Sequence, residues 1–259
     1  MIGKELIFDD SLSKLERFYI KVFGIPINGL RIRARRLLPQ VTADYKHILD
    51  SGCGQGAITF EIARRLPGSV VTGTDTDKEL IERNRRISEY SGLHNCHFEK
   101  QDITDIPAEE QYDLIISADV LEHIEDDDNA LSRYYSALAP GGALLLHVPG
   151  YMRRWILFGW KVNFEIEGHF RPGYLLEDIV KKVENSGFIV TDSHYTYGWL
   201  ETITNNISWI VTGSRMKRKY FYALIFPLLL MVSYPGRNTK PKLGAGVFIK
   251  ARKNKKTLN

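Results

Sequence analysis

Apolar and polar positions follow two different periods along most of this chain. Short apolar runs of the kind found in buried strands alternate with longer stretches in which apolar residues recur every three or four positions, as on one face of a helix. The runs that predict strands are residues 48–50, 70–74, 96–99, 114–117, 143–148, 188–192 and 246–250. Helices are predicted between them at about residues 58–66, 78–90, 127–138 and 175–186.

Strands that alternate with helices in this way predict an α/β fold with a doubly wound, mostly parallel, seven-stranded sheet. The run at 143–148 is apolar on both faces, as a central parallel strand should be. We assign the core to residues 46–194 plus 245–252. Residues 1–45 form a predicted helical segment over the ligand site or beside the sheet, and residues 195–244 form a folded insertion.

The first predicted strand leads into a glycine-rich turn, and a helix follows at once. Asp50 ends the strand, and Gly52, Gly54 and Gly56 allow the backbone to approach a ligand closely. The helix start adds free N–H groups and a partial positive charge, which together suit an anionic or polar ligand. Because Gly52, Gly54 and Ala57 also fit the dinucleotide pattern GxGxxA, the turn alone leaves more than one nucleotide cofactor open.

Two acidic residues follow the next strands. Asp75 ends the second strand in VVTGTDTD, and Asp102 follows the third in FEKQDITDIP. Each acid alone is equally well explained as a turn or helix-cap residue. Parallel strands place their carboxyl ends at one edge of the sheet, so two such acids in register with the glycine turn favour a nucleoside ligand.

Five segments in this order resemble the motifs of class I S-adenosylmethionine-dependent methyltransferases, in particular the type 11-like small-molecule and lipid methyltransferases. They are LDSGCGQG, GTD, QDI, YDLIISADVLEHI and LAPGGALLLHVP, and the resemblance covers roughly residues 45–194 plus the last strand. It implies S-adenosyl-L-methionine as cofactor, with Asp75 on the ribose, Asp102 near the adenine amino group and Ile103 against the ring. The full set of cofactor-binding residues that the resemblance implies is Asp50, Gly52, Cys53, Gly54, Gly56, Asp75, Thr76, Asp102, Ile103, Ser117 and Ala118.

The candidate catalytic residues are His169, Asp119 and His123, near the expected mouth of the site. Methyl transfer from a sulfonium is an in-line displacement, helped mainly by orientation and exclusion of water, and a base is needed only if the acceptor must lose a proton. We favour His169 as that base, with a hydrogen bond that holds a lid as the alternative. His147, isolated among Leu and Val, is interpreted as structural.

A metal ion is a minority hypothesis. Asp119, Glu122 and His123 resemble the ExxEH metal-binding element of some methyltransferases, with Asp in place of the first Glu. A carboxylate, a second carboxylate three residues later and an adjacent histidine can converge on a divalent ion. The Glu-His pair also occurs in family members without metal, so the main prediction includes none.

Composition and charge limit where the protein is expected to act and which partners it is expected to bind. The 259 residues carry a net charge of +4, and Cys53 and Cys96 give no sign of a disulfide framework or zinc cluster. With no apolar core of a signal peptide at the N-terminus, a cytoplasmic location is expected. Basic residues gather in three groups, which are either solvated faces or contacts to an anionic partner: Arg31, Arg33, Arg35 and Arg36; Arg215, Lys217, Arg218 and Lys219; and Lys250, Arg252, Lys253, Lys255 and Lys256.

The apolar run at 220–234 contains Pro227 and is too short to span a bilayer as a helix. It is either a buried helix over the active site or an interfacial element that meets an anionic membrane surface, peripherally at the inner face. Aromatic residues in both insertions add apolar surface: Tyr151, Trp155, Phe158, Trp160, Trp199 and Trp209. These features favour a small, apolar or lipid-like acceptor, methylated on oxygen by default.

Two alternatives stay open. The basic groups could serve an RNA methyltransferase, although their position in a lid and a tail rather than a continuous tract argues against nucleic acid. A non-catalytic, membrane-associated cofactor-binding protein would share the glycine turn and the apolar run. The sequence makes no statement about oligomeric state.

Overall fold

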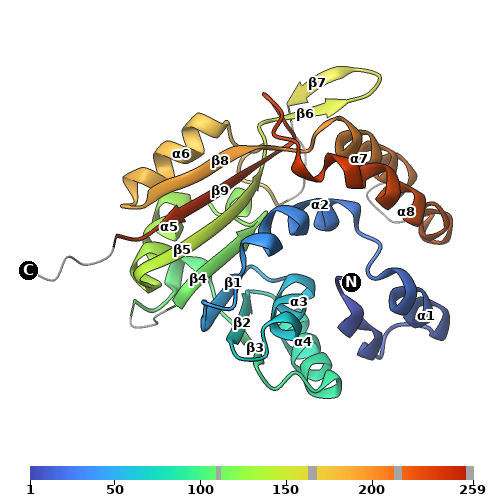
Figure 1. Cartoon of the computed structure of the whole chain (residues 1–259), viewed down its shortest axis with the longest axis horizontal. Helices are drawn as coiled ribbons and strands as arrows, with labels where there is room; N and C mark the ends of the chain where they lie inside the picture. Colours follow the sequence, from blue (N-terminus) through green and yellow to red (C-terminus); the bar gives the residue numbers. More distant parts are fainter. Residues whose placement is uncertain (109–111, 163–167, 213–217, 255–259) are drawn as a thin grey trace, which may run out of the picture.

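The computed structural model describes residues 1–108, 112–162, 168–212 and 218–254. Within them, seven strands form one sheet in the order β3-β2-β1-β4-β5-β9-β8 (Figure 1). Pairing is parallel from β3 through β5, and β9 runs antiparallel to both β5 and β8. The strands are β1 (His47–Ser51), β2 (Val70–Asp75), β3 (Cys96–Lys100), β4 (Tyr112–Ala118), β5 (Leu138–Pro149), β8 (Ile189–Thr196) and β9 (Gly246–Arg252). The predicted seven-stranded, mostly parallel α/β sheet is confirmed.

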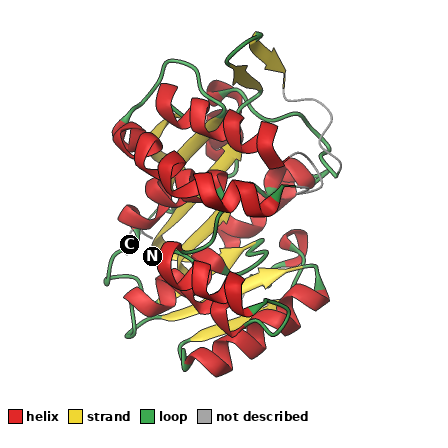
Figure 2. Ribbon diagram, turned by 90° about the vertical axis from the view of Figure 1, so that its right-hand side faces the viewer, coloured by secondary structure: helices red, strands yellow, loops and turns green. Residues whose placement is uncertain are grey.

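Successive apolar residues of the central strands point to opposite faces of the sheet, as the two-residue period of a strand requires. Ile48 and Ile116 join the apolar cluster on one face, whereas Leu49 and Ile115 join the cluster on the other. Helices cover both faces (Figure 2). The first face packs against α2 (Asn28–Leu37), α3 (Ala57–Arg65) and α4 (Lys78–Ser91), and the second against α5 (Asp127–Ala137) and α6 (Leu176–Asn185).

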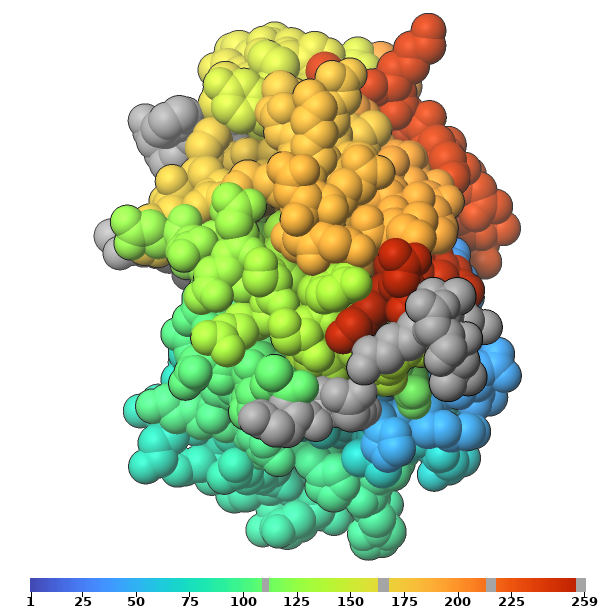
Figure 3. Space-filling view, turned by 90° about the vertical axis from the view of Figure 1, so that its left-hand side faces the viewer, coloured from blue at the N-terminus to red at the C-terminus, as the bar shows by residue number. Residues whose placement is uncertain are grey.

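Figure 3 shows the residues of α6 and β8, in orange, and those of α5, in light green, forming a continuous outer face. Short 3-10 helices connect several of the elements. They are η1 (Lys4–Phe8), η2 (Leu38–Gln40), η3 (Ile103–Asp105), η4 (Leu121–His123) and η5 (Tyr234–Asn238).

Four helices from the two ends of the chain form a cap, by which we mean α1 (Lys14–Phe23), α2, α7 (Trp199–Thr212) and α8 (Lys219–Ser233). They gather at one end of the sheet (Figure 1). The Arg36 guanidinium of α2 lies 2.8 Å from the carboxylate of Glu201 of α7, and both side chains are buried. This ion pair ties the N-terminal segment to the late insertion.

The insertion after β5 contains an unpredicted hairpin, β6 (Met152–Trp155) and β7 (Gly159–Val162), that projects beside α7 (Figure 1). Trp155 of β6 meets Trp209 of α7 edge to face, with ring centroids 6.1 Å apart. The basic residues Arg215, Lys217, Lys255 and Lys256 lie outside the described residues.

Helix α8, which contains the apolar run, buries one face and exposes the other. Its buried positions are Tyr222, Phe226, Leu229 and Ser233, a spacing that places them on one face against α7 and α1. The opposite face exposes Phe221, Leu224, Leu228 and Met231 to solvent. In the described part of the chain, no helix combines the length and apolarity needed to cross a bilayer.

Candidate active site

The glycine turn sits between β1 and α3, and its three glycines have φ values of 73° (Gly52), 50° (Gly54) and 72° (Gly56). These left-handed values favour glycine because a Cβ atom is strained there. A Cβ on Gly52 would lie 2.4 Å from Val120, so Gly52 is also needed for close packing against the residue after Asp119. A Cβ on Gly54 would meet no atom within 4 Å. The turn is therefore open at Gly54, where a ligand can approach.

Asp50 supports the turn from below. It is buried, and the Thr59 hydroxyl of α3 donates to its carboxylate at 2.6 Å. Burial raises the pKa of Asp50 to about 6, and it also raises the pKa of the neighbouring Cys53 thiol. Both side chains are thus packed or bonded within the protein, and the predicted contact of each with a cofactor stays a prediction.

The two predicted nucleoside-binding acids lie at the same edge of the sheet as the turn. The Asp75 carboxylate accepts the N–H groups of Gly54 at 2.9 Å and Asp77 at 3.1 Å, one on each oxygen. Asp102 caps η3 by accepting the Thr104 N–H at 2.8 Å and hydroxyl at 2.7 Å. Each Asp75 oxygen can accept one further bond, and the two Thr104 bonds both fall on Asp102 Oδ1 and leave Oδ2 available, so these turn roles leave room for ribose and adenine contacts.

The remaining residues of the predicted cofactor set differ in exposure. Thr76 is exposed beside Asp75, and Ile103 is buried beside Asp102. The Ser117 side chain is buried and lies 3.2 Å from the Tyr134 hydroxyl of α5. Its hydroxyl therefore serves the sheet–helix contact, which leaves its backbone and half-buried Ala118 to border any ligand at the end of β4.

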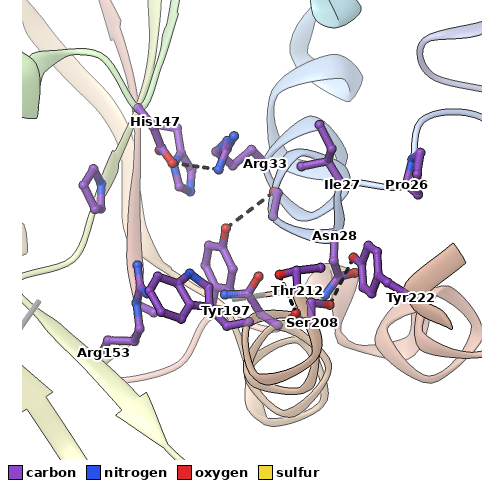
Figure 4. Close-up of a pocket in the computed structure, with 16 residues that line it drawn as sticks. Pro26, Ile27, Asn28, Arg33, His147, Arg153, Tyr197, Ser208, Thr212 and Tyr222 are labelled. Atoms are coloured by element: carbon purple, nitrogen blue, oxygen red, sulfur yellow. Dashed lines mark hydrogen bonds and ion pairs between the residues drawn. The ribbon is translucent and has the colours of Figure 1, made fainter. Parts of the chain in front are cut away.

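Beyond β4 the sheet and the cap enclose a cavity of about 350 Å³, called here the Asp119 cavity (Figure 4). Its polar centre is Asp119, whose carboxylate lies 2.7 Å from Arg33 of α2 and 2.7 Å from Nδ1 of His147 of β5. The second nitrogen of His147 lies 3.0 Å from the Thr196 hydroxyl. His147, interpreted from the sequence as isolated, is thus bonded to a candidate catalytic residue in the wall of this cavity.

The charge of Asp119 follows from these neighbours. Burial alone would raise the pKa of Asp119, but the Arg33 guanidinium and His147 outweigh it and hold the pKa at about 2. A carboxylate with so low a pKa is a weak base at neutral pH. Asp119 is therefore suited to hold Arg33 and His147 in place rather than to remove a proton.

Backbone strain also concentrates in this cavity. Among the described non-glycine residues, Asp119 (φ 57°) and Tyr197 (φ 63°) are the two with positive φ, and both line the cavity. Such conformations cost of order 1–3 kcal/mol each and tend to occur at functional sites. Strain of this kind supports treating the cavity as a candidate functional site.

A second polar group lies where Gly168 and His169 meet η4. The rings of His123 and His169 are 4.4 Å apart, and Nδ1 of His123 lies 2.8 Å from the Gly168 carbonyl oxygen. Burial and the charge of Asp119 raise the pKa of Glu122 well above its usual value, and burial and His123 lower the pKa of His169. His169 is therefore a neutral imidazole at pH 7.

The same three residues differ from the predicted metal-binding set. Ligand atoms of Glu122, His123 and His169 lie within 4.8 Å of one another, whereas Asp119 is held by Arg33 and His147. Glu122 Oε2 and His169 Nδ1 are buried with no hydrogen-bond partner among the described residues. The structure thus brings His169 to the Glu122-His123 pair in place of Asp119.

Comparison with known families resolves the choice of cofactor class that the turn alone leaves open. A family model described as a methyltransferase domain matches residues 43–195. The chain belongs to this methyltransferase family. The predicted class I S-adenosylmethionine-dependent methyltransferase is therefore confirmed as the family, and S-adenosylmethionine as its cofactor.

Relatives of this chain differ in the acceptors that their names give. It is 32% identical over 114 residues to a ubiquinone biosynthesis O-methyltransferase of Coxiella burnetii, which covers 44% of this chain and 47% of that protein. It is 33% identical over 114 residues to a trans-aconitate 2-methyltransferase of Streptomyces coelicolor, which covers 44% of this chain and 38% of that protein. The chain thus spans less than half the length of these curated relatives.

The fold of this chain also resembles solved structures. Phosphoethanolamine N-methyltransferase 2 of Haemonchus contortus, solved with S-adenosyl-L-methionine, aligns with a TM-score of 0.59 at 18% identity, over 98% of this chain and 61% of that chain. At that identity the likeness supports the fold alone.

Sequence reasoning missed part of the Asp119 cavity. Arg153 and Tyr197 line it together with Arg33, yet none was predicted as a site residue. The available signals were indirect: Arg33 belongs to a basic group, and Arg153 lies in the basic-aromatic segment RRW. Their meeting depends on how the cap folds back on the sheet.

Proposed function

We propose that this chain transfers a methyl group from S-adenosylmethionine to a small, lipid-like acceptor, on oxygen by default. The observation that carries the proposal is the adjacency of two sites. Val120, next to Asp119, packs against Gly52, so the glycine turn and the Asp119 cavity share a border. A cofactor on the turn would thereby face an acceptor in the cavity.

The residues suggest how each part of the cofactor is bound. Asp75 accepts the ribose hydroxyls, Asp102 and Ile103 border the adenine, and the open backbone at Gly54 meets the methionine part. The methyl group then points past Ala118 towards the cavity. Since displacement at a sulfonium needs alignment more than acid–base help, the contribution of the cavity is to orient the acceptor and exclude water.

His169 is the residue we favour as base for an acceptor that must lose a proton. Its lowered pKa keeps it unprotonated at neutral pH, as a base must be. A divalent ion is the alternative role of the same group, because the orphaned atoms of Glu122 and His169 beside His123 fit such an ion: one carboxylate and two imidazoles form an ordinary donor set. When bound, the ion would lower the pKa of an acceptor hydroxyl.

The surface supports an acceptor that comes from a membrane. Large apolar side chains are exposed on both α1 and α8, among them Leu15, Phe18, Phe221, Leu224, Leu228 and Met231. The exposed basic residues Lys21 and Arg218 belong to the same two segments. An apolar face flanked by basic residues is the pattern of an interfacial element on an anionic bilayer.

The test has two stages. Calorimetry with S-adenosylhomocysteine should show binding to the wild type, weaker binding to Asp75→Ala and unchanged binding to Asp178→Ala, an exposed acid on α6. Incubation with methyl-labelled S-adenosylmethionine and a total lipid extract should then label a lipid. Absence of S-adenosylhomocysteine binding would overturn the proposal, whereas binding without transfer would favour the non-catalytic alternative. Transfer to RNA, with retention that falls steeply with salt, would favour the RNA alternative.

A further inference from the structure

The Asp119 cavity holds more positive charge than its own carboxylate balances. Arg33 is paired with Asp119 at 2.7 Å. Arg153 of β6 also lines the cavity, and its guanidinium has no ion pair or hydrogen bond to any residue that the structure describes. Its aromatic neighbour is Trp209, whose ring centroid lies 5.8 Å from the guanidinium carbon.

A guanidinium that has no paired anion costs free energy in a partly enclosed site unless a ligand supplies the anion. Burial disfavours the charged form of Arg153 and so lowers its pKa, although Tyr197 and Asp119 oppose the change. The lowered pKa expresses the same free-energy cost. Neutral polar groups nearby are also available, since Asn28 Oδ1 is buried without a hydrogen-bond partner among the described residues. The cavity therefore suits a ligand with an anionic group and at least one donor.

A second, apolar hollow of about 630 Å³ lies between α1 and α8, called here the apolar groove. Its walls include Leu12, Leu15, Phe18, Tyr19, Ala223 and Leu224. Pro26 and Ile27, which connect α1 to α2, line both the apolar groove and the Asp119 cavity. Pro26 and Ile27 are thus wall residues common to the two hollows, and the groove is bordered by exposed apolar side chains of α1 and α8 (Leu15, Phe18 and Leu224).

We propose that the acceptor is an amphiphile with an anionic group, a carboxylate or a phosphate, that Arg153 binds in the Asp119 cavity while the apolar chain of the acceptor lies in the groove. This inference rests on the proposed function, because it names the acceptor of that reaction. It changes the expectation from the sequence, which was an apolar acceptor without a stated charge. Arg153 supplies charge-assisted hydrogen bonds to the anion, and the groove supplies burial for the chain.

The experiment measures binding of defined probes to the full chain in the presence of S-adenosylhomocysteine. Decanoate and decyl phosphate are the anionic probes, decanol is the neutral one, and acetate and inorganic phosphate lack the chain. We expect one of the two anionic amphiphiles to bind at least about tenfold more tightly than decanol and than its own short counterpart. Which of them binds better identifies the source of the anion.

Variants test which residues cause the preference for an anionic amphiphile. Arg153→Met should lower the affinity for the preferred anion to that for decanol, and Arg153→Lys should retain part of the preference. Lys161→Gln removes a charge from the exposed cross-strand partner of Arg153 and should bind as the wild type does. Ala223→Phe, which fills the groove, should abolish the gain from the ten-carbon chain while leaving the preference for an anion.

Two results would overturn the inference: equal affinity of the wild type for decanol and both anionic amphiphiles, or an unchanged preference in Arg153→Met. S-adenosylhomocysteine is titrated into every variant as well. Normal binding of this nucleoside shows that the variant is folded and that the cofactor site is intact. A wild type that does not bind it contradicts the proposed function, whereas the probe series alone tests the anionic acceptor.

Discussion

The glycine turn and the Asp119 cavity lie side by side at one edge of the sheet, yet different kinds of contact hold them. In the half that we assign to the cofactor, Asp102 accepts bonds from Thr104, two residues away, and Asp75 accepts from Asp77 in the same way and from Gly54, 21 residues away. The half that we assign to the acceptor forms only under the cap, which distant pairs hold, such as Arg36 with Glu201, 165 residues apart. The first half is built by turns at strand ends, and the second exists only once the cap has folded onto the sheet.

This difference agrees with the extent of the family match. The methyltransferase-domain model matches residues 43–195, which include the glycine turn and leave out α1, α2, α7 and α8. A cofactor site that local turns build can be kept while a separately folded cap changes around it. The cap is therefore where we expect the choice of acceptor to be determined.

The largest expected effect comes from breaking the link between α2 and α7. Above pH 7, where Glu201 is ionised in the folded state, Arg36→Met leaves its carboxylate buried without an ion-pair partner and should lower the free energy of unfolding by about 3 kcal/mol. Urea denaturation measures this change. The double variant Arg36→Met, Glu201→Leu should recover most of the loss, because it removes both buried charges. A loss below about 1 kcal/mol for the single variant would show that the cap does not depend on this pair.

The same pair predicts a pH dependence. Burial raises the pKa of Glu201 to about 7, although Arg36 opposes the change, so the folded state binds a proton that the unfolded state releases near its ordinary pKa of 4.5. The contribution of Glu201 to the free energy of unfolding should therefore fall as pH rises from about 4.5 to about 7, and it should stay constant above pH 7. The difference in free energy of unfolding between wild type and Glu201→Gln should show this fall. A difference that does not change with pH would contradict the raised pKa of Glu201.

In the cofactor half, Asp75→Ala removes the acceptor of the ribose hydroxyls. Loss of hydrogen bonds to a charged group should weaken S-adenosylhomocysteine binding about thirtyfold, and calorimetry measures it. The variant should still bind the preferred anionic amphiphile. If binding of both ligands falls together, the two halves are not independent.

Gly54→Ala gives a smaller and more selective effect. The new methyl group meets no protein atom within 4 Å, so the cost to stability is the left-handed backbone alone, about 1–2 kcal/mol. Because the methyl group occupies the open face of the turn, S-adenosylhomocysteine affinity should fall about tenfold. Gly52→Ala is the contrasting variant, since its methyl group would collide with Val120 and destabilise the fold itself. Normal cofactor binding in Gly54→Ala would show that the cofactor does not approach there.

Most features near the glycine turn could be predicted from the sequence, whereas the contacts of the cap and of the Asp119 cavity could not. The strand runs, the glycine turn and the acids Asp75 and Asp102 are local patterns, and the structure brings them to one edge. The bonding of His147 to Asp119 could not be foreseen, because an isolated histidine in an apolar strand carries no sign of its partner. The β6–β7 hairpin and the role of Arg153 depend on packing against α7, which no short pattern encodes.

The smallest expected effect is electrostatic and lies on the outside of the cap. Lys21→Gln should weaken binding to vesicles that contain anionic lipid about fivefold, at roughly 1 kcal/mol for one basic residue near the surface. Lys181→Gln, an exposed lysine on α6 at the other face of the sheet, is the matched control. Vesicle pelleting at low and high salt measures both, and equal losses would contradict a membrane-facing cap.

The most direct measurement follows the methyl group through both halves of the site. Wild type, Asp75→Ala and Arg153→Met are each incubated with methyl-labelled S-adenosylmethionine and a total lipid extract, and label in the organic phase is counted. We predict label in an anionic lipid or its methylated product with the wild type, and at least about tenfold less with either variant, although Arg153→Met binds S-adenosylhomocysteine normally. Equal labelling by the wild type and Arg153→Met, or no labelling by the wild type, would contradict the account.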